Sequence, residues 1–156
     1  MKKVWTITFA MIAMAVVACG ADNTLGVWRY NASESKLPAG MSPIRNLVLT
    51  REGIDAGAKI SAKEDRADGS KLDTTTTVRY DGKKVAVTGT GLRWNTTAIT
   101  QADANTLVEE RWMTGTTYHS IVHTVVSADG KKTTSTASGT GADGKAFTAI
   151  IVFDKQ

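Results

Sequence analysis

The sequence predicts an all-β protein, an antiparallel up-and-down β-barrel of about eight to ten strands, for two reasons. First, four Asp-Gly pairs divide the chain, at Asp68-Gly69, Asp81-Gly82, Asp129-Gly130 and Asp143-Gly144. Asp-Gly supplies the positive φ angles that a tight hairpin turn demands, so each pair indicates a place where two strands reverse direction. Second, the runs between the pairs are rich in threonine, valine and isoleucine, which suit a pleated and half-buried surface.

The same reasoning, taken in chain order, predicts ten strands. Residues 72–80 form the clearest one, because the four threonines at 74–77 lose side-chain freedom in a helix. The segment 58–64 is weaker, and a helical turn is its alternative. Residues 98–113 also contain helix formers, but Asp103-Ala104-Asn105 fits a turn between two strands better. The ten expected strands are Leu25–Tyr30, Asn46–Arg51, Ala58–Glu64, Leu72–Tyr80, Lys84–Thr88, Leu92–Ile99, Thr106–Met113, Thr116–Val126, Lys132–Ser138 and Ala146–Asp154.

We expect the sheet to close on itself, because closure removes the exposed strand edges that invite aggregation. Residues 31–43 hold both prolines and should form a loop over one end of the sheet. A β-sandwich is the alternative, although the Trp-centred signature and the disulfide of an immunoglobulin-type sandwich are missing. The folded part holds no cysteine pair, so its core alone must stabilise it.

The first 18 residues are expected to be a lipoprotein-type signal peptide and not part of the fold. Lys2 and Lys3 form a basic start, and Val4–Ala18 is an apolar stretch without a charge. That stretch is shorter than the ~20 residues that span a bilayer, which makes an uncleaved anchor the weaker alternative. Cleavage after Ala18 leaves 156 − 18 = 138 residues and lowers the formal charge from +4 to +4 − 2 = +2. No basic cluster survives, so no nucleic-acid partner is expected.

The end of this segment, Val16-Val17-Ala18-Cys19, resembles the bacterial lipobox, in which the cysteine is lipidated and becomes the first residue of the mature protein. The resemblance implies an exported protein of the periplasm or cell envelope, held to a membrane by a lipid on Cys19. Gly20 stands where an aspartate is associated with inner-membrane retention, which favours the outer membrane if the cell has two. The alternative is cleavage after Gly20 or Ala21, with Cys19 discarded. We expect residues 19–24 to be a tether and residues 25–156 to be a single β-barrel domain.

A second resemblance concerns the mature chain. Gly26-x-Trp28, on the first expected strand, is similar to the Gly-x-Trp signature of the lipocalins and their relatives. The resemblance implies a barrel with a cavity for an apolar ligand, and it names no ligand. The arginine-bearing motif that typical lipocalins carry at a later strand end is missing. The wider pattern resembles small exported lipocalin-like (calycin-type) proteins of bacteria, through Gly26–Asn31, Ser35-Lys36, Tyr80–Lys83, Asp103–Thr106, Val126–Lys131 and the ending Asp154–Gln156.

Aromatic residues and the two histidines are the candidate ligand contacts, because ligand pockets are mostly apolar with a few placed polar groups. His119 and His123 are four residues apart, so they share one face of a strand at a distance of about 13 Å. That distance is too long for a shared metal ion, and the chain offers no further histidine, so we expect no metal site and no cofactor. The expected ligand-binding residues are Tyr80, Trp94, Trp112, Tyr118, His119 and His123.

The strand before the histidines carries Glu109 and Arg111 on one face and Glu110 and Trp112 on the other. Charged side chains disfavour a barrel interior, so we expect Glu109 and Arg111 to face solvent. The alternative is a buried arginine that awaits a carboxylate or a fatty-acid headgroup.

Three functions are compatible with these patterns. The one we favour is an extracytoplasmic barrel that binds an apolar or amphipathic small molecule, without catalysis. The second is a structural or interaction lipoprotein of the envelope with a filled core. The third is a cavity enzyme, in which His119 or His123 is the general base and Arg111 or Arg79 stabilises an oxyanion. The enzyme hypothesis fails if both histidines face outward.

Overall fold

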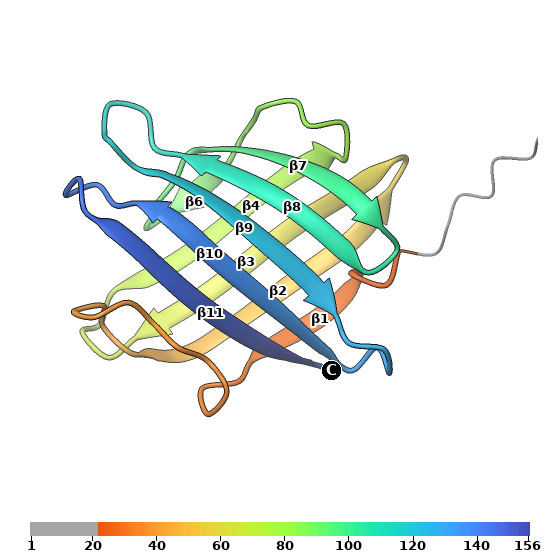
Figure 1. The fold of residues 1–156 in the computed structure, drawn as a ribbon, viewed down its shortest axis with the longest axis horizontal. Helices are drawn as coiled ribbons and strands as arrows, with labels where there is room; N and C mark the ends of the chain where they lie inside the picture. The colour runs from red at the N-terminus through yellow and green to blue at the C-terminus, as the bar shows by residue number, and fades with distance from the viewer. Residues whose placement is uncertain (1–21) are drawn as a thin grey trace, which may run out of the picture.

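The computed structural model describes residues 22–156, so the signal segment and Cys19 lie outside the described residues. Eleven strands form one antiparallel sheet that curls into a nearly closed barrel, which confirms the predicted all-β class (Figure 1). In this part of the chain no helix is long and apolar enough to cross a bilayer. The strands are β1 (Gly26–Tyr30), β2 (Ile44–Ile54), β3 (Gly57–Arg66), β4 (Lys71–Arg79), β5 (Val85–Ala86), β6 (Thr88–Thr90), β7 (Thr96–Asp103), β8 (Thr106–Trp112), β9 (His119–Val126), β10 (Lys132–Thr140) and β11 (Ala146–Lys155).

Two features close the barrel: the short segment Val85–Thr90, and a single bridge between Asp81, just after β4, and Thr100 on β7. The first half of the segment, β5, pairs with β7 over two residues, and its second half, β6, pairs with β4 over three. Both edges of the sheet therefore come from the same segment, in the order β5-β7-β8-β9-β10-β11-β1-β2-β3-β4-β6. The sequence predicts a single strand here. The structure divides it, because the chain crosses here from the β7 edge to the β4 edge, and the strand count rises to eleven.

Two glycines permit this crossing. Gly89 has φ +132°, and a Cβ there would lie 2.0 Å from the carbonyl oxygen of Asp73. Gly91 has φ +68°, and its Cβ would lie 1.9 Å from the carbonyl oxygen of Lys71. Only glycine tolerates both the conformation and the close approach of β4. The strand predicted over 92–99 begins only at Thr96, since residues 91–95 connect the two edges.

The four Asp-Gly pairs form turns, but only three of them join paired strands. Asp68-Gly69, Asp129-Gly130 and Asp143-Gly144 close the β3–β4, β9–β10 and β10–β11 hairpins. Asp81-Gly82 follows β4 and leads to β5, which does not pair with β4. In all four, the aspartate Oδ1 accepts a hydrogen bond from the backbone N–H two residues on. The β2–β3 turn lacks a glycine, and Ala56 adopts the positive φ of 54° there.

Alternation along each strand separates the interior from the exterior. On β9, Ser120, Val122, Thr124 and Val126 are buried, and the residues between them face outward. The interior contains two hydrophobic clusters, one around Trp28 and one around Val78. The first also includes Ile44, Leu47, Val126 and Phe153, and the second includes Ile99 and Leu107.

The two ends of the barrel differ. At one end, which we call the closed end, the arm Asp22–Leu25 lies beside the β7–β8 turn (Figure 1). The backbone N–H of Asn23 donates to the carbonyl oxygen of Ala104 at 2.9 Å, and the buried Trp28 indole donates to that of Thr24 at 2.9 Å. Part of the expected tether is therefore docked on the barrel.

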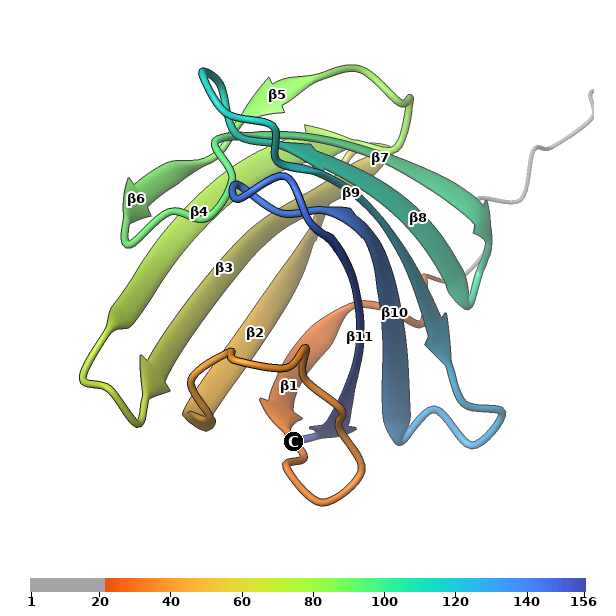
Figure 2. The same cartoon turned by 60° about the vertical axis from the view of Figure 1, so that its left-hand side comes forward.

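The opposite end, which we call the mouth, is bordered by the loop 31–43 and by residues 91–95, 113–118 and 141–145. The loop 31–43, orange in Figure 2, bridges to β11 through the pair Lys36 and Ile150. Its position at one end of the sheet agrees with the expectation from its prolines.

Candidate functional site

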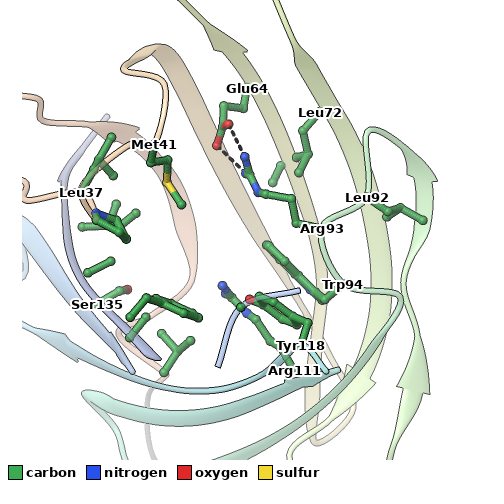
Figure 3. A pocket seen from close by; sticks show the side chains of 18 of the residues that line it. Leu37, Met41, Glu64, Leu72, Leu92, Arg93, Trp94, Arg111, Tyr118 and Ser135 are labelled. Carbon is green, nitrogen blue, oxygen red and sulfur yellow. Dashed lines mark hydrogen bonds and ion pairs between the residues drawn. The ribbon is translucent and has the colours of Figure 1, made fainter. Parts of the chain in front are cut away.

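A cavity of about 950 Å³ opens toward the mouth, inside the barrel (Figure 3). Ligand pockets commonly measure about 300–1,000 Å³, so this cavity has room for one small molecule. A filled core, the second of the hypotheses above, requires a much smaller space. Much of the wall is apolar, including Leu37, Met41, Leu49, Ile60, Leu72 and Ile151.

Arg51 interrupts this apolar wall. It lies on β2 two residues after Leu49, on the inward face, and only 5% of its surface is exposed. Its Nε and Nη1 atoms have no hydrogen-bond partner among the described residues. Burial lowers the pKa of Arg51 from its ordinary value, because desolvation disfavours the charged form. A buried guanidinium without a partner is costly, so this part of the cavity suits an anion.

Glu109 and Arg111 on β8 also face inward, so the expectation that they lie in solvent is wrong. The guanidinium Nη2 of Arg111 donates to Glu109 Oε2 at 2.8 Å, and the Thr97 hydroxyl donates to Oε1 at 2.7 Å. The orientation follows from Leu107, which is buried on the same face of β8. The negative charge of Glu109 also acts on Arg51, and these three groups together carry a net charge of 2 − 1 = +1. Asp22 adds a smaller attraction to Arg51.

Of the six predicted ligand contacts, Trp94 and Tyr118 line the cavity (Figure 3). The guanidinium of Arg111 lies 4.1 Å from the centre of the Trp94 ring. The Tyr118 ring stacks on Phe147 with 6.1 Å between their centres, and its hydroxyl lies 3.1 Å from that of Ser120. Their role as ligand contacts stays a prediction.

Trp112, His119 and His123 face away from the cavity, which corrects the predicted set. The reason is the alternation of β9, which turns Ser120 and Val122 inward and both histidines outward. On this outer face the Trp112 and His119 rings stack with 5.4 Å between their centres. A cavity enzyme that uses either histidine as its base is incompatible with this arrangement.

Tyr80 lies at the closed end and does not line the cavity. Its hydroxyl donates to Asp22 Oδ2 at 3.0 Å. Burial, together with the charge of Asp22, raises the pKa of Tyr80 to about 12. Tyr80 therefore holds the arm in place.

A second charged cluster lies at the mouth. Glu64, which is 4% exposed, accepts hydrogen bonds from Nη1 and Nη2 of Arg93 at 2.8 Å each, and another from Nε of Arg66. Arg66 also donates to the carbonyl oxygen of Ser42 at 3.0 Å. The dashed lines in Figure 3 mark the pair of bonds from Arg93. The Glu64 carboxylate thus holds the connection 91–95 to β3 through Arg93. Through Arg66, the same cluster also reaches the segment before β2.

We expect acid to destabilise the barrel through these two inward carboxylates. Burial alone would raise the pKa of Glu64, but hydrogen bonds and charges from Arg93 and Arg66 outweigh it and lower the pKa. Burial would also raise the pKa of Glu109, but the charge of Arg111 and its hydrogen bond outweigh that effect and lower the pKa. Each group stabilises the fold above its unfolded pKa of about 4.3, and that contribution is lost as the pH falls through the folded pKa. Urea titrations should show the free energy of unfolding falling below about pH 4.3, and a rise there would contradict the expectation.

The comparisons with known proteins concern the fold. No family model matches the chain, and no curated protein matches it in sequence. A solved structure of zebrafish ileal bile acid-binding protein, complexed with cholic acid, is similar, with a TM-score of 0.51 and 12% identity. The similarity covers 86% of this chain and 99% of that chain.

The fold that the two structures share is an all-β, antiparallel and nearly closed barrel of the lipocalin-like kind. This confirms the predicted fold class, and at 12% identity the likeness shows the fold alone. Among the described residues there is no group of three or more His, Cys, Asp or Glu side chains that could hold a metal ion. The charged groups that line the cavity include the guanidinium groups of Arg51, Arg93 and Arg111 and the carboxylates of Glu64 and Glu109.

Sequence reasoning missed Arg51 and Glu64, although a signal for each was present. Leu47 and Leu49 share one face of a strand, and alternation puts Arg51 on the same face. Ile60 likewise predicts the orientation of Glu64, four residues later on β3. In both cases the signal is the alternation of side chains between the two faces of a strand, which applies to charged residues as well as to apolar ones.

Proposed function

We propose that this protein binds one amphipathic small molecule with an anionic group inside its barrel, and that it does so without catalysis. The observation that supports the proposal most directly is Arg51, which is buried in the cavity wall with two unpaired donor nitrogens. Arg111 adds a second guanidinium, whose Nε is also unpaired among the described residues. A carboxylate, sulfonate or phosphate would pair with these donors, whereas a neutral molecule would leave them unsatisfied.

The apolar wall would supply most of the affinity. Burial of apolar surface contributes about 25 cal/mol per Å², so an alkyl or ring system that buries about 300 Å² gains roughly 7 kcal/mol before the entropic cost of binding. Hydrogen bonds to a charged group add about 1.5–3 kcal/mol and orient the ligand. The anionic group would lie deep in the barrel, and the apolar body would extend toward the mouth.

The structural neighbour supports this class of ligand. That protein was solved with cholic acid, which is itself an amphipathic carboxylic acid. Its low identity to this chain gives no reason to expect the same ligand. A direct search is native mass spectrometry of the protein purified from its own host, where a bound acid would appear as a defined mass increment.

We further propose that the protein works outside the cytoplasm, as a lipoprotein of the cell envelope. The basic start, the apolar stretch and Cys19 at the end of a lipobox-like sequence support this location. The outer membrane is the expected site in a cell with two membranes. The chain would then comprise the signal segment 1–18, a tether from Cys19 and the barrel domain 25–156.

Substitution of Arg51 by methionine tests the anion-binding role. Palmitate and its neutral counterpart hexadecanol are suitable probes, because they share an alkyl chain and differ in charge. We expect the intact protein to prefer palmitate, and Arg51→Met to weaken palmitate binding roughly 10- to 100-fold in calorimetric titrations, the loss of a charge-assisted hydrogen bond. Hexadecanol binding should change little.

Two controls accompany this test. The empty Arg51→Met protein should be at least as stable as the intact one, because the substitution removes an unpaired buried charge. His123→Ala changes the exposed outer face and should leave palmitate affinity unchanged. Equal affinity of the intact protein for the acid and the alcohol would overturn the proposed role of Arg51.

A further inference from the structure

We infer that the closed end of the barrel faces the membrane and that the mouth opens away from it, into the aqueous phase. The inference rests on the lipidation of Cys19 proposed above and goes beyond it, because it identifies the surface that meets the bilayer. The partner is the headgroup layer of the leaflet that holds the lipid on Cys19. Three features of the closed end support this orientation.

The first feature is the docking of the arm. Asn23 donates from its backbone N–H to Ala104 at 2.9 Å and from its side-chain amide to Asn105 at 2.7 Å. Asp22 accepts the hydroxyl of Tyr80 at 3.0 Å, so the first described residue is already held to the barrel. The arm therefore cannot act as a hinge that lets the barrel turn over.

The second feature is the short chain between the lipid and this docked residue. Cys19 and Asp22 are 22 − 19 = 3 residues apart in the sequence. A fully extended chain spans about 3.5 Å per residue, so Asp22 lies within roughly 10 Å of the lipidated cysteine. The longest strand, β2, has 11 residues, and with the tilt of a barrel it rises roughly 25 Å along the barrel axis. The mouth is thus out of reach of the bilayer surface.

The third feature is a pair of exposed aliphatic side chains near the arm. Val27 on β1 and Ile54 at the end of β2 are each 40% exposed. β1 begins at the closed end, and β2 ends there. Val27 pairs with Thr50, and Ile54 forms the last pair before the β2–β3 turn. Aliphatic side chains at this position suit the boundary between headgroups and acyl chains.

This orientation has a consequence for the ligand. An opening that faces away from the protein's own membrane would exchange its ligand with the aqueous phase or with a second carrier. Uptake directly from the leaflet that holds Cys19 would require the mouth to lie on that leaflet. The barrel would therefore act as a receiver of dispersed amphiphiles.

Two identical sequences provide a matched test. Ala128-Asp129-Gly130-Lys131 forms the β9–β10 turn at the closed end, and Ala142-Asp143-Gly144-Lys145 forms the β10–β11 turn at the mouth. Both alanines are exposed, so Ala128→Cys and Ala142→Cys place a fluorophore in the same local sequence at opposite ends of β10. The thiol of Cys19 is consumed by the lipid, which leaves one cysteine to label.

The full-length lipidated protein is reconstituted into phosphatidylcholine vesicles that contain a headgroup-linked energy acceptor. Energy transfer from position 128 should exceed that from position 142 at least about twofold, because the two ends differ by roughly 25 Å in height. Insertion of 20 Gly/Ser residues after Gly20 should abolish the difference, since such a linker spans roughly 25 Å.

The failures of the two proposals are distinguishable. Intact-mass analysis that finds Cys19 unmodified would overturn both the lipid anchor and this orientation. A lipidated protein with equal or stronger transfer from position 142 would overturn the orientation alone. Neither result bears on palmitate binding, which is measured with the protein in solution.

Discussion

Replacement of Trp28 by alanine should lower the free energy of unfolding by about 3–5 kcal/mol. Trp28 is fully buried, packs against Ile44, Leu47 and Phe153, and donates its indole N–H to the carbonyl oxygen of Thr24. The substitution leaves both a cavity and an unsatisfied carbonyl. Domains of this size are stable by only about 5–15 kcal/mol, so the urea concentration at the unfolding midpoint should fall strongly.

Trp112→Ala is the matched control. The same residue type is removed there from the outer face, where Lys84 lies 4.0 Å from the ring centre and His119 stacks on it. We expect a loss of about 1 kcal/mol or less, chiefly that cation–π contact. Trp28→Phe retains part of the packing and should lie between the two if Trp28→Ala fails to fold. Equal losses for the two alanine variants would contradict the assigned core.

Glu64→Gln should be the second large effect, with a loss of about 3–5 kcal/mol in unfolding free energy. Glutamine keeps the size of the side chain but removes the charge that compensates Arg66, whose side chain is only 9% exposed, and Arg93. Burying a cation without its partner is the main cost. The same urea titration measures it, and the stability of the variant should no longer depend on the ionisation of residue 64 in acid.

An exposed ion pair provides the comparison. Lys63 and Asp73 lie 3.5 Å apart with side chains 73% and 62% exposed, so Asp73→Asn should change stability by no more than about 1 kcal/mol. If Glu64→Gln cost no more than Asp73→Asn, the mouth cluster would be a surface contact in energetic terms. The connection 91–95 would then be held to β3 by other means.

The fold was predictable because its main signals are local. The threonines at 74–77 and the Asp-Gly turns act through the conformations of a few neighbouring residues, and they produce β4 and three hairpins. The closure was not predictable in detail, since the pairing of Val85–Thr90 with both β4 and β7 depends on the circumference of the whole sheet. The β2–β3 turn was not predicted for another reason: alanine, at position 56, is not a residue type that favours turns.

The candidate site shows a different limit. The general rule that charges face solvent misplaces Glu109 and Arg111, because the two side chains form an ion pair inside the barrel. Aromatic content alone does not distinguish Trp94 in the cavity from Trp112 on the outer wall. Only the face of each strand decides, and that face is fixed once one buried residue, such as Leu107, is known.

The short closing segment bears on which molecules the barrel can admit. Val85–Thr90 joins its two neighbours through 2 + 3 = 5 paired residues, whereas β3 alone forms nine pairs with β4. A ligand broader than the cavity would separate the strands first at these short pairings, and the longer pairings, such as that of β3 with β4, would keep their register. If the barrel binds a ligand as we propose, its tolerance for ligands of different breadth would depend on this six-residue stretch.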